Sequence, residues 1–313
     1  MSAYLTSLNN ESLIHFQGPD TATFLQGQVT CDVRKVSESN TLAGAYCTPK
    51  GRVIVDFLLG QAGPNHWLMR VHKDVTQHTA QTLSKYIVFS KSELESQRTD
   101  WLVLGCWGDK AASTLRAHFG EVPNALHAST GTGSALIIAR DNNAQRFELW
   151  LEREHCAQQI EALSANCLPG SMERWSGMDI ESGLARVCAA TTEKMTPQAL
   201  NYDLTGHVDF RKGCYTGQEV VARLHYKGES KRRAFAASIG KENTTEAGAA
   251  IVTPDGPTVG TVLNQGVDEE QRPVVLIELA LKAKTQTLLL ASDQNANPIT
   301  LLPLPYSLAG ETQ

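Results

Sequence analysis

The order of strand-like and helical patterns limits the fold of this chain more than any other feature of its sequence. Hairpin-like strand runs and helical patterns follow each other in two rounds, the first within about 1–98 and the second within about 99–228. Paired strands with helices between them indicate two α+β halves of ferredoxin-like character and argue against a doubly wound parallel sheet. The strand-like runs are residues 12–16, 41–47, 52–60, 67–72, 100–106, 135–139 and 146–151. The helical patterns are residues 20–28, 74–87, 109–119, 153–165 and 172–184, and the first two are expected to begin at the N-caps Asp20 and Asp74.

A different pattern begins after Arg233. Short β-rich runs recur every 8 to 14 residues, with Gly, Pro, Asn and Asp between them. This spacing is typical of a small antiparallel barrel or sandwich. The polar, charged segment 227–233 marks the change. We therefore expect an α+β region over residues 1–228 and a C-terminal antiparallel β-barrel over residues 229–313.

The composition is that of an ordinary globular protein, with 42% hydrophobic and 19% charged residues. A chain of 313 residues is long for one core, so more than one packed unit is expected. The net charge of -5 argues against a chain that is basic throughout and binds nucleic acid, although a local basic patch stays open. No apolar run reaches the roughly 18 residues that span a bilayer, and a secretory signal pattern is missing, so we expect a cytoplasmic location without membrane contact.

Seven cysteines are scattered along the chain without a CxxC pair and without histidines at ligand spacing. The pattern argues against a disulfide framework and against a self-contained zinc or cluster site. We expect no metal site within the chain, and we expect most of the thiols to be small buried groups in a reducing cytosol.

The stretch KGCYTGQEVVAR, residues 212–223, places Cys214 on a turn between a glycine and an aromatic residue. Thr216 is the predicted N-cap of a helix that follows. The N-terminus of this helix and the neighbouring Arg211 and Lys212 would both favour the thiolate form of Cys214. The residues alone leave two interpretations open, a reactive thiol or a small side chain that fits a tight turn.

Residues 211–233 form a basic window with a net charge of +5 in a chain of net charge -5. Such a run is either a solvated surface or a patch that faces an anion. Its position beside the turn at Cys214 favours the second interpretation, with a carboxylate tail or an RNA backbone as partner. The basic residues of the window are Arg211, Lys212, Arg223, Lys227, Lys231, Arg232 and Arg233.

Three residues outside this window are further candidates for a site. Asp56 interrupts the apolar run RVIVDFLL. It either faces solvent through strand alternation or points inward, where a carboxylate needs a hydrogen-bond donor or an amine. Trp175 and Tyr202 are large aromatic residues that either belong to the core or stack on a flat heterocycle.

Four stretches of the chain together resemble the YgfZ family of bacterial folate-binding proteins, which is related to mitochondrial proteins of iron–sulfur assembly. The resemblance covers most of the first 233 residues, and the K-G-C-Y-x-G-Q-E signature is its most specific part. The barrel region is similar in the order of its elements only. The four stretches are FLQGQVTCDV (24–33), GAYCTPKGR (44–52), PQALNYDLTGHVDFRKGCYTGQEVVAR (197–223) and KGESKRR (227–233).

The resemblance implies the fold of the glycine-cleavage aminomethyltransferase, with α+β halves and a β-barrel around a folate channel, and tetrahydrofolate or a derivative as cofactor. It implies a functional thiol at Cys214 and folate contacts at Trp175 and near Glu11, where a family member carries an aromatic residue. Asp56 aligns with the aspartate that aminomethyltransferases use beside folate. The remaining predicted folate contacts are Tyr202, Lys212 and Arg223.

The leading hypothesis is a folate-binding accessory factor for iron–sulfur enzymes, which thereby supports tRNA modification such as methylthiolation. Its expected partners are enzymes of the radical-SAM tRNA methylthiotransferase type, with a weak tRNA contact. The alternative is a tetrahydrofolate-dependent aminomethyltransferase that relies on Asp56, although that class does not call for a signature cysteine. A third hypothesis is an RNA-binding adaptor using residues 211–233. The acidic overall charge and the lack of aromatic residues interleaved with basic ones argue against the adaptor.

Overall fold

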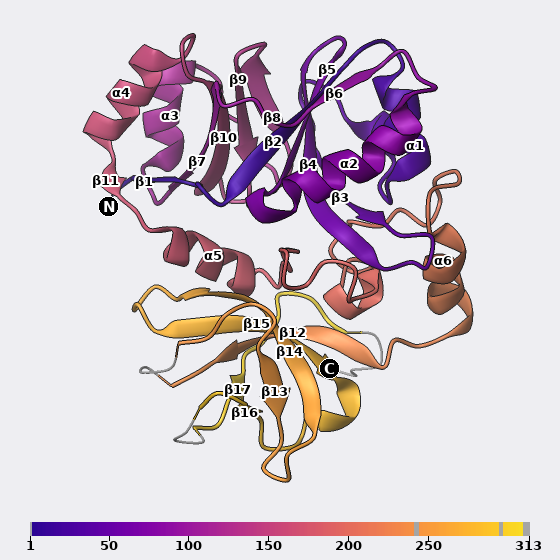
Figure 1. Ribbon diagram of the computed structural model, residues 1–313. Coiled ribbons are helices and arrows are strands. Elements are labelled where there is room, and N and C mark those ends of the chain that lie inside the picture. The colour runs from indigo at the N-terminus through magenta and orange to yellow at the C-terminus, as the bar shows by residue number, and fades with distance from the viewer. Residues whose placement is uncertain (1, 241–243, 294–296, 309–313) are drawn as a thin grey trace. The chain divides into compact units, whose positions relative to one another are not determined.

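Residues 2–240, 244–293 and 297–308 are described by the structure, a computed structural model of the chain (Figure 1). They group into two units, each assembled from separate stretches of the sequence. This grouping differs from the linear division expected at residues 228 and 229, because the stretch from Met172 to Phe210 groups with the C-terminal strands. The first unit comprises Met1–Tyr46, Val55–Ser171 and Arg211–Tyr215, and the second comprises Cys47–Ile54, Met172–Phe210 and Thr216–Gln313.

A five-stranded sheet in the order β3-β4-β5-β2-β6 carries the first round of the predicted pattern. Its central strands pair antiparallel, with Ile14 opposite Met69. The four strands expected before residue 73 are all present, so the β-rich runs of the sequence predicted them correctly. The strands are β2 (Glu11–Gln17), β3 (Leu42–Cys47), β4 (Val53–Gly63), β5 (His66–His72) and β6 (Glu93–Glu95), and the helices are α1 (Thr21–Gln28) and α2 (Thr76–Ile87).

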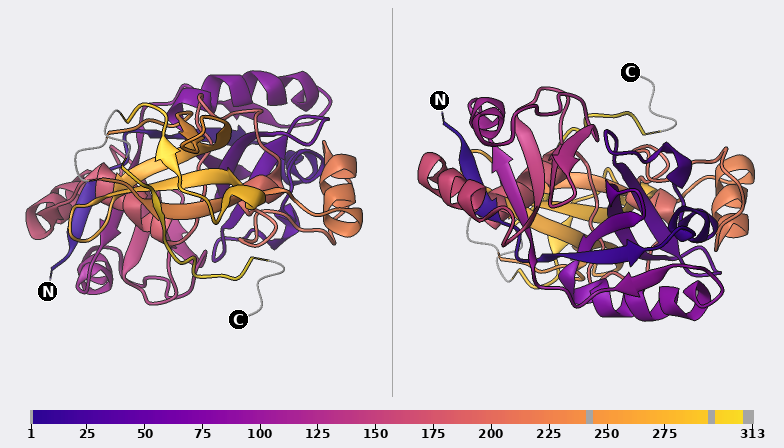
Figure 2. Two further views of the ribbon diagram at one scale, coloured as in Figure 1. Left: turned by 90° about the horizontal axis from the view of Figure 1, so that it is seen from below. Right: turned by 90° about the horizontal axis from the view of Figure 1, so that it is seen from above.

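A six-stranded sheet in the order β11-β1-β7-β10-β9-β8 carries the second round. Two helices lie side by side on one of its faces (Figures 1 and 2), where Leu115 and Leu163 pack into a core with Phe147 and Leu149. The strands are β1 (Tyr4–Ser7), β7 (Trp101–Trp107), β8 (Ser129–Thr132), β9 (Ala135–Ala139), β10 (Arg146–Glu152) and β11 (Leu168–Pro169), and the helices are α3 (Ala111–Phe119) and α4 (Ala157–Asn166).

The two sheets of the first unit approach each other closely at Gly60 on β4. A Cβ atom at this position would lie 2.6 Å from Leu136 Cδ2 and 3.0 Å from Trp150 Cζ3. Both distances are too short for any larger residue without movement of the neighbours, so a glycine is needed where β4 meets β9 and β10.

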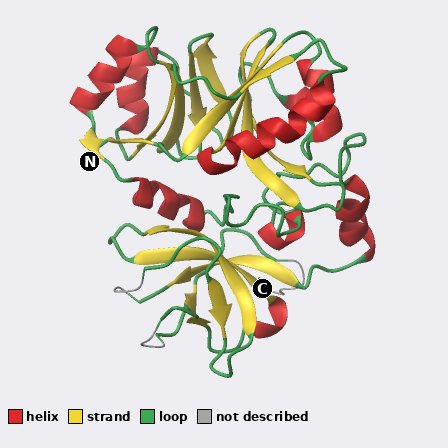
Figure 3. Cartoon of the chain, in the orientation of Figure 1, coloured by secondary structure: helices red, strands yellow, loops and turns green. Residues whose placement is uncertain are grey.

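Strands of the second unit form one antiparallel sheet in the order β16-β13-β14-β15-β12-β17 (Figure 3). The backbone N–H of Ile299 donates to the carbonyl oxygen of Leu288 over 2.8 Å, and this bridge joins the two edge strands. The sheet therefore curls into a half-barrel whose edges meet at this one bridge, in agreement with the antiparallel β-rich C-terminal region that the sequence predicted. The elements of the unit are β12 (Arg232–Ser238), β13 (Ala250–Val252), β14 (Thr258–Val267), β15 (Pro273–Ala280), β16 (Leu289–Leu290), β17 (Thr300–Leu301), α5 (Met172–Glu181) and α6 (Gln218–Lys227).

Predicted N-caps differ from the caps in the structure because their side chains bind elsewhere. Asp20 does stand at the N-cap of α1, but its carboxylate accepts from the backbone N–H of Lys91 over 2.8 Å. Asp74 was expected to cap α2, yet it lies in the preceding 3-10 turn and its Oδ1 is 2.6 Å from Nδ1 of His72.

The cap of α6 is also displaced from its predicted position. Thr216 was expected there, but the N-cap is Gly217, with φ of 85°. This left-handed conformation favours glycine. A Cβ atom at Gly217 would also lie 2.5 Å from the carbonyl oxygen of Thr48. The conformation and the close approach therefore both account for a glycine at the start of α6.

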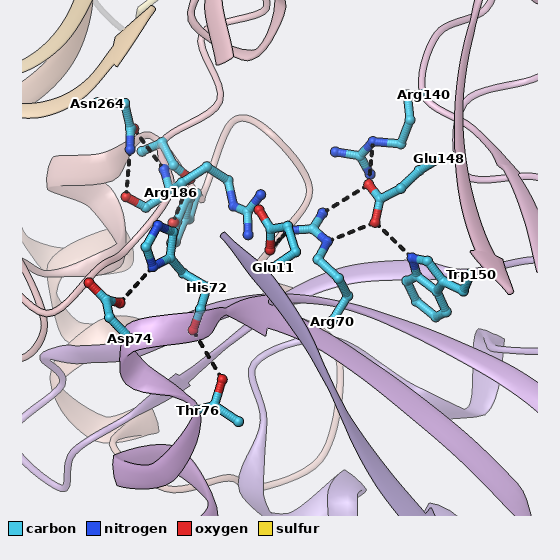
Figure 4. Close-up of polar contacts among 12 residues, drawn as sticks. Glu11, Arg70, His72, Asp74, Thr76, Arg140, Glu148, Trp150, Arg186 and Asn264 are labelled. Atoms are coloured by element: carbon cyan, nitrogen blue, oxygen red, sulfur yellow. Dashed lines mark hydrogen bonds and ion pairs between the residues drawn. The ribbon is translucent and has the colours of Figure 1, made fainter. Parts of the chain in front are cut away.

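A buried ion pair connects the two sheets of the first unit (Figure 4). Arg70 on β5 donates from Nε to Oε1 of Glu148 on β10 over 2.9 Å, and from Nη2 to Oε2 over 3.3 Å. Glu148 also accepts from Trp150 Nε1 over 2.8 Å and pairs with Arg140 Nε at 3.5 Å. Glu11 Oε2 lies 3.5 Å from Nη1 of Arg70. These polar contacts compensate for removing Arg70 and Glu148 from water.

Removing the carboxylate of Glu148 should destabilise the protein strongly, because two buried guanidinium groups would lose their shared anion. We expect Glu148→Gln to lower the free energy of unfolding by about 3–5 kcal/mol in urea titrations. The matched control is Asp100→Asn, which removes a carboxylate whose side chain is 41% exposed in its pair with Arg98. Its cost should stay within about 1 kcal/mol. Equal losses in the two variants would contradict the role of the buried pair.

A pair of neutral histidines lies between β2 and β5. His15 Nδ1 is 2.9 Å from His66 Nε2, and Trp101 packs edge-on against His15 with ring centroids 5.7 Å apart. Burial and the positive charge of Arg98 lower the pKa of His15 from 6.5 to about 3. Burial also lowers the pKa of His66. His15 therefore stays neutral in the folded protein at pH values where an unfolded chain protonates it.

The lowered pKa of His15 predicts a loss of stability in mild acid. The unfolded state takes up a proton near pH 6.5 and the folded state only near pH 3. The free energy of unfolding should therefore fall as the pH drops through this window, with a slope of up to ~1.4 kcal/mol per pH unit from His15. Urea titrations of His15→Gln across this pH range should show a shallower slope than the wild type. Identical slopes for the two proteins would rule out His15 as a source.

Candidate functional site

The loop Arg211–Tyr215 is anchored to the first unit by Lys212. Its ammonium group donates to the carbonyl oxygen of Gln26 over 2.7 Å and to that of Val29. Gln26 lies in the last turn of α1 and Val29 is its C-cap, so the cation sits at the negative end of the helix. Lys212 is only 5% exposed. The sequence predicted that the ammonium group of Lys212 contacts folate. In the structure this group is bound by two backbone carbonyl oxygens of the protein.

Tyr215 is the second anchor of this loop. It is buried, and the ammonium group of Lys212 lies 5.1 Å from the centre of its ring. Gly213 and Cys214, between the two anchors, are both exposed. A Cβ atom added to Gly213 would meet nothing within 4 Å, so the space around this position is open. The signature therefore holds a thiol at the surface of the first unit between two fixed side chains.

Cys214 differs from the other cysteines in exposure. All seven lie in the described residues; five of the others are buried and Cys167 is partly exposed. Burial raises the pKa of Cys47 to about 12, which suppresses its reactivity as a nucleophile. Among the seven cysteines, Cys214 is thus the exposed one. The buried cysteines are Cys31, Cys47, Cys106, Cys156 and Cys188.

Two predicted carboxylates of the site, Asp56 and Glu11, are buried in the first unit. Asp56 on β4 is 2% exposed, so of the two alternatives that the sequence left open the structure supports the inward-facing one. It lies in a run in which Val53 to Gly60 are all buried, because both faces of this strand are covered. Glu11 faces Arg70, as described above, and forms part of the network of buried charges.

Trp175, Tyr202 and Arg223 belong to the second unit. Trp175 on α5 is 5% exposed. Tyr202 is fully buried, donates its hydroxyl to the carbonyl oxygen of Ala185 over 2.9 Å and stacks on His207 with centroids 4.3 Å apart. These contacts support the core interpretation of Tyr202. Arg223 lies exposed on α6. A contact of these residues with folate stays a prediction.

The basic window divides into structural and surface cations. Besides Lys212, Arg233 is buried and donates to Asp203 over 2.6 Å and to the carbonyl oxygen of Gln198 over 2.9 Å. Arg232 forms a bidentate pair with Glu278. Four of the seven cations remain exposed, and they are Arg211, Arg223, Lys227 and Lys231.

An aromatic cluster in the second unit was not predicted. Phe210 stacks on His225 with centroids 3.6 Å apart and planes 12° apart, and Tyr226 meets both rings edge-on. Tyr226 is 65% exposed. The sequence did contain a signal, since these aromatic residues flank the basic residues of the window. The contact itself depends on how the chain folds back from residue 210 to α6.

Within the described part of the chain, no helix is long and apolar enough to cross a membrane. In the same residues, no group of three or more His, Cys, Asp or Glu side chains lies close enough to hold a metal ion.

Comparison with known proteins agrees with the resemblance found in the sequence. The chain is 30% identical over 308 residues to the tRNA-modifying protein YgfZ of Yersinia pestis, covering 97% of this chain and 93% of that protein. It is 29% identical over 309 residues to the same protein of Cronobacter sakazakii, with the same coverage. Residues 2–131 match the GCVT N-terminal domain family. The fold is similar to the glycine cleavage system aminomethyltransferase T of Bartonella henselae, with a TM-score of 0.79 and 17% identity, covering 97% of this chain and 86% of that one.

Proposed function

Since the chain belongs to the family of the tRNA-modifying protein YgfZ, we propose that it is a folate-binding accessory protein of iron–sulfur enzymes. In this role it supports tRNA modification, with Cys214 as its reactive group. The observation that carries the proposal is the exposure of Cys214 between two anchored residues, Lys212 and Tyr215. A loop fixed in this way presents a thiol to another molecule at little entropic cost.

The chemistry of the buried groups supports tetrahydrofolate as ligand. Asp56 is a buried carboxylate on a strand of the matched domain, and the pterin ring offers N–H donors that such a carboxylate can accept. Trp175 would supply a flat apolar surface. When bound, tetrahydrofolate would supply a carrier for one-carbon units.

Cys214 would act on an iron–sulfur cluster as substrate, not as a resident cofactor. A single thiolate supplies one ligand, whereas clusters held by proteins commonly use four. The client enzyme would therefore provide the others during a transient contact. Such a contact needs an exposed thiol, and the remaining cysteines are wholly or partly buried.

Direct binding measurements test the folate half of this proposal. Calorimetric titration with tetrahydrofolate should show saturable binding to the wild type. Asp56→Asn should weaken it about 10- to 150-fold through loss of one charge-assisted hydrogen bond, whereas Asp100→Asn should bind normally. Absence of binding to the wild type would contradict the proposal. Formation of methylenetetrahydrofolate from an aminomethyl donor would instead indicate the aminomethyltransferase alternative.

Complementation tests the role of Cys214. In bacteria that lack the chromosomal copy, the wild-type protein should restore methylthiolated tRNA nucleosides, measured by mass spectrometry. Cys214→Ser should leave them at the level of the deletion strain, because a hydroxyl does not replace a thiolate ligand. Cys156→Ser is the matched control, since that thiol is buried and donates to the carbonyl oxygen of Ser134 over 3.3 Å. Restoration by Cys214→Ser, at equal protein level, would refute the role of this thiol.

A further inference from the structure

A basic groove lies entirely within the second unit, along the segment that leads from α6 to β12. It has a volume of about 1050 Å³ and is lined by Tyr226 to Arg232 and by Ala280 to Lys282. A second hollow of about 520 Å³ shares Glu229 to Arg232 with it and extends to Arg52 and Lys194. We treat these two adjoining hollows as one surface and call it the basic groove.

The charges of the basic groove are strongly one-sided. Arg232 and Glu278 neutralise each other through their bidentate pair. Five other cations then face the single carboxylate of Glu229. Within the described residues, none of the five pairs with a carboxylate. Because the whole chain is acidic, this local excess attracts polyanions that the rest of the surface repels. The five cations are Arg52, Lys194, Lys227, Lys231 and Lys282.

Aromatic rings stand at one end of the basic groove. Tyr226 belongs to its lining and is 65% exposed, and it is held edge-on by the stacked rings of Phe210 and His225. An exposed ring that is supported by other rings offers a platform on which a flat base can stack. Cations and aromatic rings are thus adjacent in space, although they are not interleaved along the sequence.

We infer that the basic groove binds a single-stranded segment of RNA, such as a tRNA loop, with phosphates on its lysines and an unstacked base on Tyr226. The aromatic platform favours RNA over an acidic peptide or a polyglutamate tail, because those would use the cations but not the ring. The choice of RNA rests on the proposed role in tRNA modification. Neither Cys214 nor Asp56 belongs to the lining of the groove, so the two proposals can fail separately.

Fluorescence anisotropy with a labelled tRNA anticodon stem-loop and the full-length protein tests this inference. We expect a Kd of ~1–100 µM at physiological salt and a logarithmic salt slope of about −0.7 for each phosphate contacted. Replacing two lysines of the groove together, Lys231→Gln and Lys282→Gln, should reduce that slope by ~1.4. The matched control is the pair Lys85→Gln and Lys110→Gln, which removes two exposed charges of the first unit, one on α2 and one at the N-cap of α3, and should leave the slope unchanged.

Variants of Tyr226 separate stacking from charge. Tyr226→Ala should weaken RNA binding roughly 5- to 150-fold with little change in salt slope, whereas Tyr226→Phe should restore it. Equal affinities of Tyr226→Ala and wild type, or equal slopes for the two lysine pairs, would overturn the inference. Binding of a polyglutamylated folate through Lys231 and Lys282, without binding of RNA, would overturn it as well.

The same variants distinguish this inference from the proposed function. The Tyr226 and lysine variants should bind monoglutamyl tetrahydrofolate like the wild type, since they alter neither Asp56 nor Trp175. If RNA binding fails while folate binding and complementation by the wild type succeed, only the basic groove inference falls. If RNA binds as expected and folate does not, the proposed function falls and the groove stands.

Discussion

The ion pair of Arg70 and Glu148 is the constraint on which the first unit depends. A charge transferred from water to a protein interior loses several kcal/mol of hydration, which only a well-placed partner offsets. Arg70 stands on one sheet and Glu148 on the other, so neither sheet can satisfy its own charge. Apolar packing at Gly60 brings the sheets together, but such packing tolerates small displacements. The bidentate hydrogen bonds of Arg70 and Glu148 tolerate much smaller displacements of the sheets. This ion pair therefore determines how the two sheets face each other.

A second buried cation, Lys212, has the same effect on the signature loop. Residues 211–215 are far in sequence from the rest of the first unit, yet they group with it. The ammonium group explains why, because it satisfies carbonyl oxygens at the C-terminus of α1 that the helix leaves unpaired. Gln26 and Val29 belong to the stretch FLQGQVTCDV, which the family resemblance also includes. The presence of both this stretch and the K-G-C-Y-x-G-Q-E signature then has a physical reason. The stretch supplies the carbonyl oxygens that accept hydrogen bonds, and the signature supplies the ammonium group of Lys212 that donates them.

Local patterns in the sequence predicted the elements well and their long-range contacts poorly. Most strands and helices could be found because alternation and helical spacing act over a few residues. The caps failed where a side chain had a better partner, as Asp20 does in the backbone of Lys91 and Asp74 in His72. The burial of Asp56 could not be read from alternation, because β4 is covered on both faces.

At the candidate site, too, the sequence predicted the features that depend on neighbouring residues and missed those that depend on residues distant in the sequence. The sequence identified Cys214 and placed it on a turn, and the structure confirms that it is exposed. The sequence did not distinguish cations that serve the fold from those that face solvent. Lys212 and Arg233 differ from Lys227 and Lys231 only in what lies opposite them. That difference arises from residues that are distant in the sequence, namely Gln26, Val29 and Asp203.

The division of the basic window into engaged and exposed cations affects how the surface can bind an anion. Had all seven cations pointed outward, the window would be a diffuse electrostatic surface whose effect salt screens within about 10 Å. Because Arg232 and Arg233 are engaged within the second unit, the exposed Lys227 and Lys231 lie close in the chain to side chains that are held in place. Fixed charges beside a supported ring at Tyr226 can discriminate by shape as well as by charge. The cations that stabilise this part of the fold thus also restrict where the neighbouring exposed cations can lie.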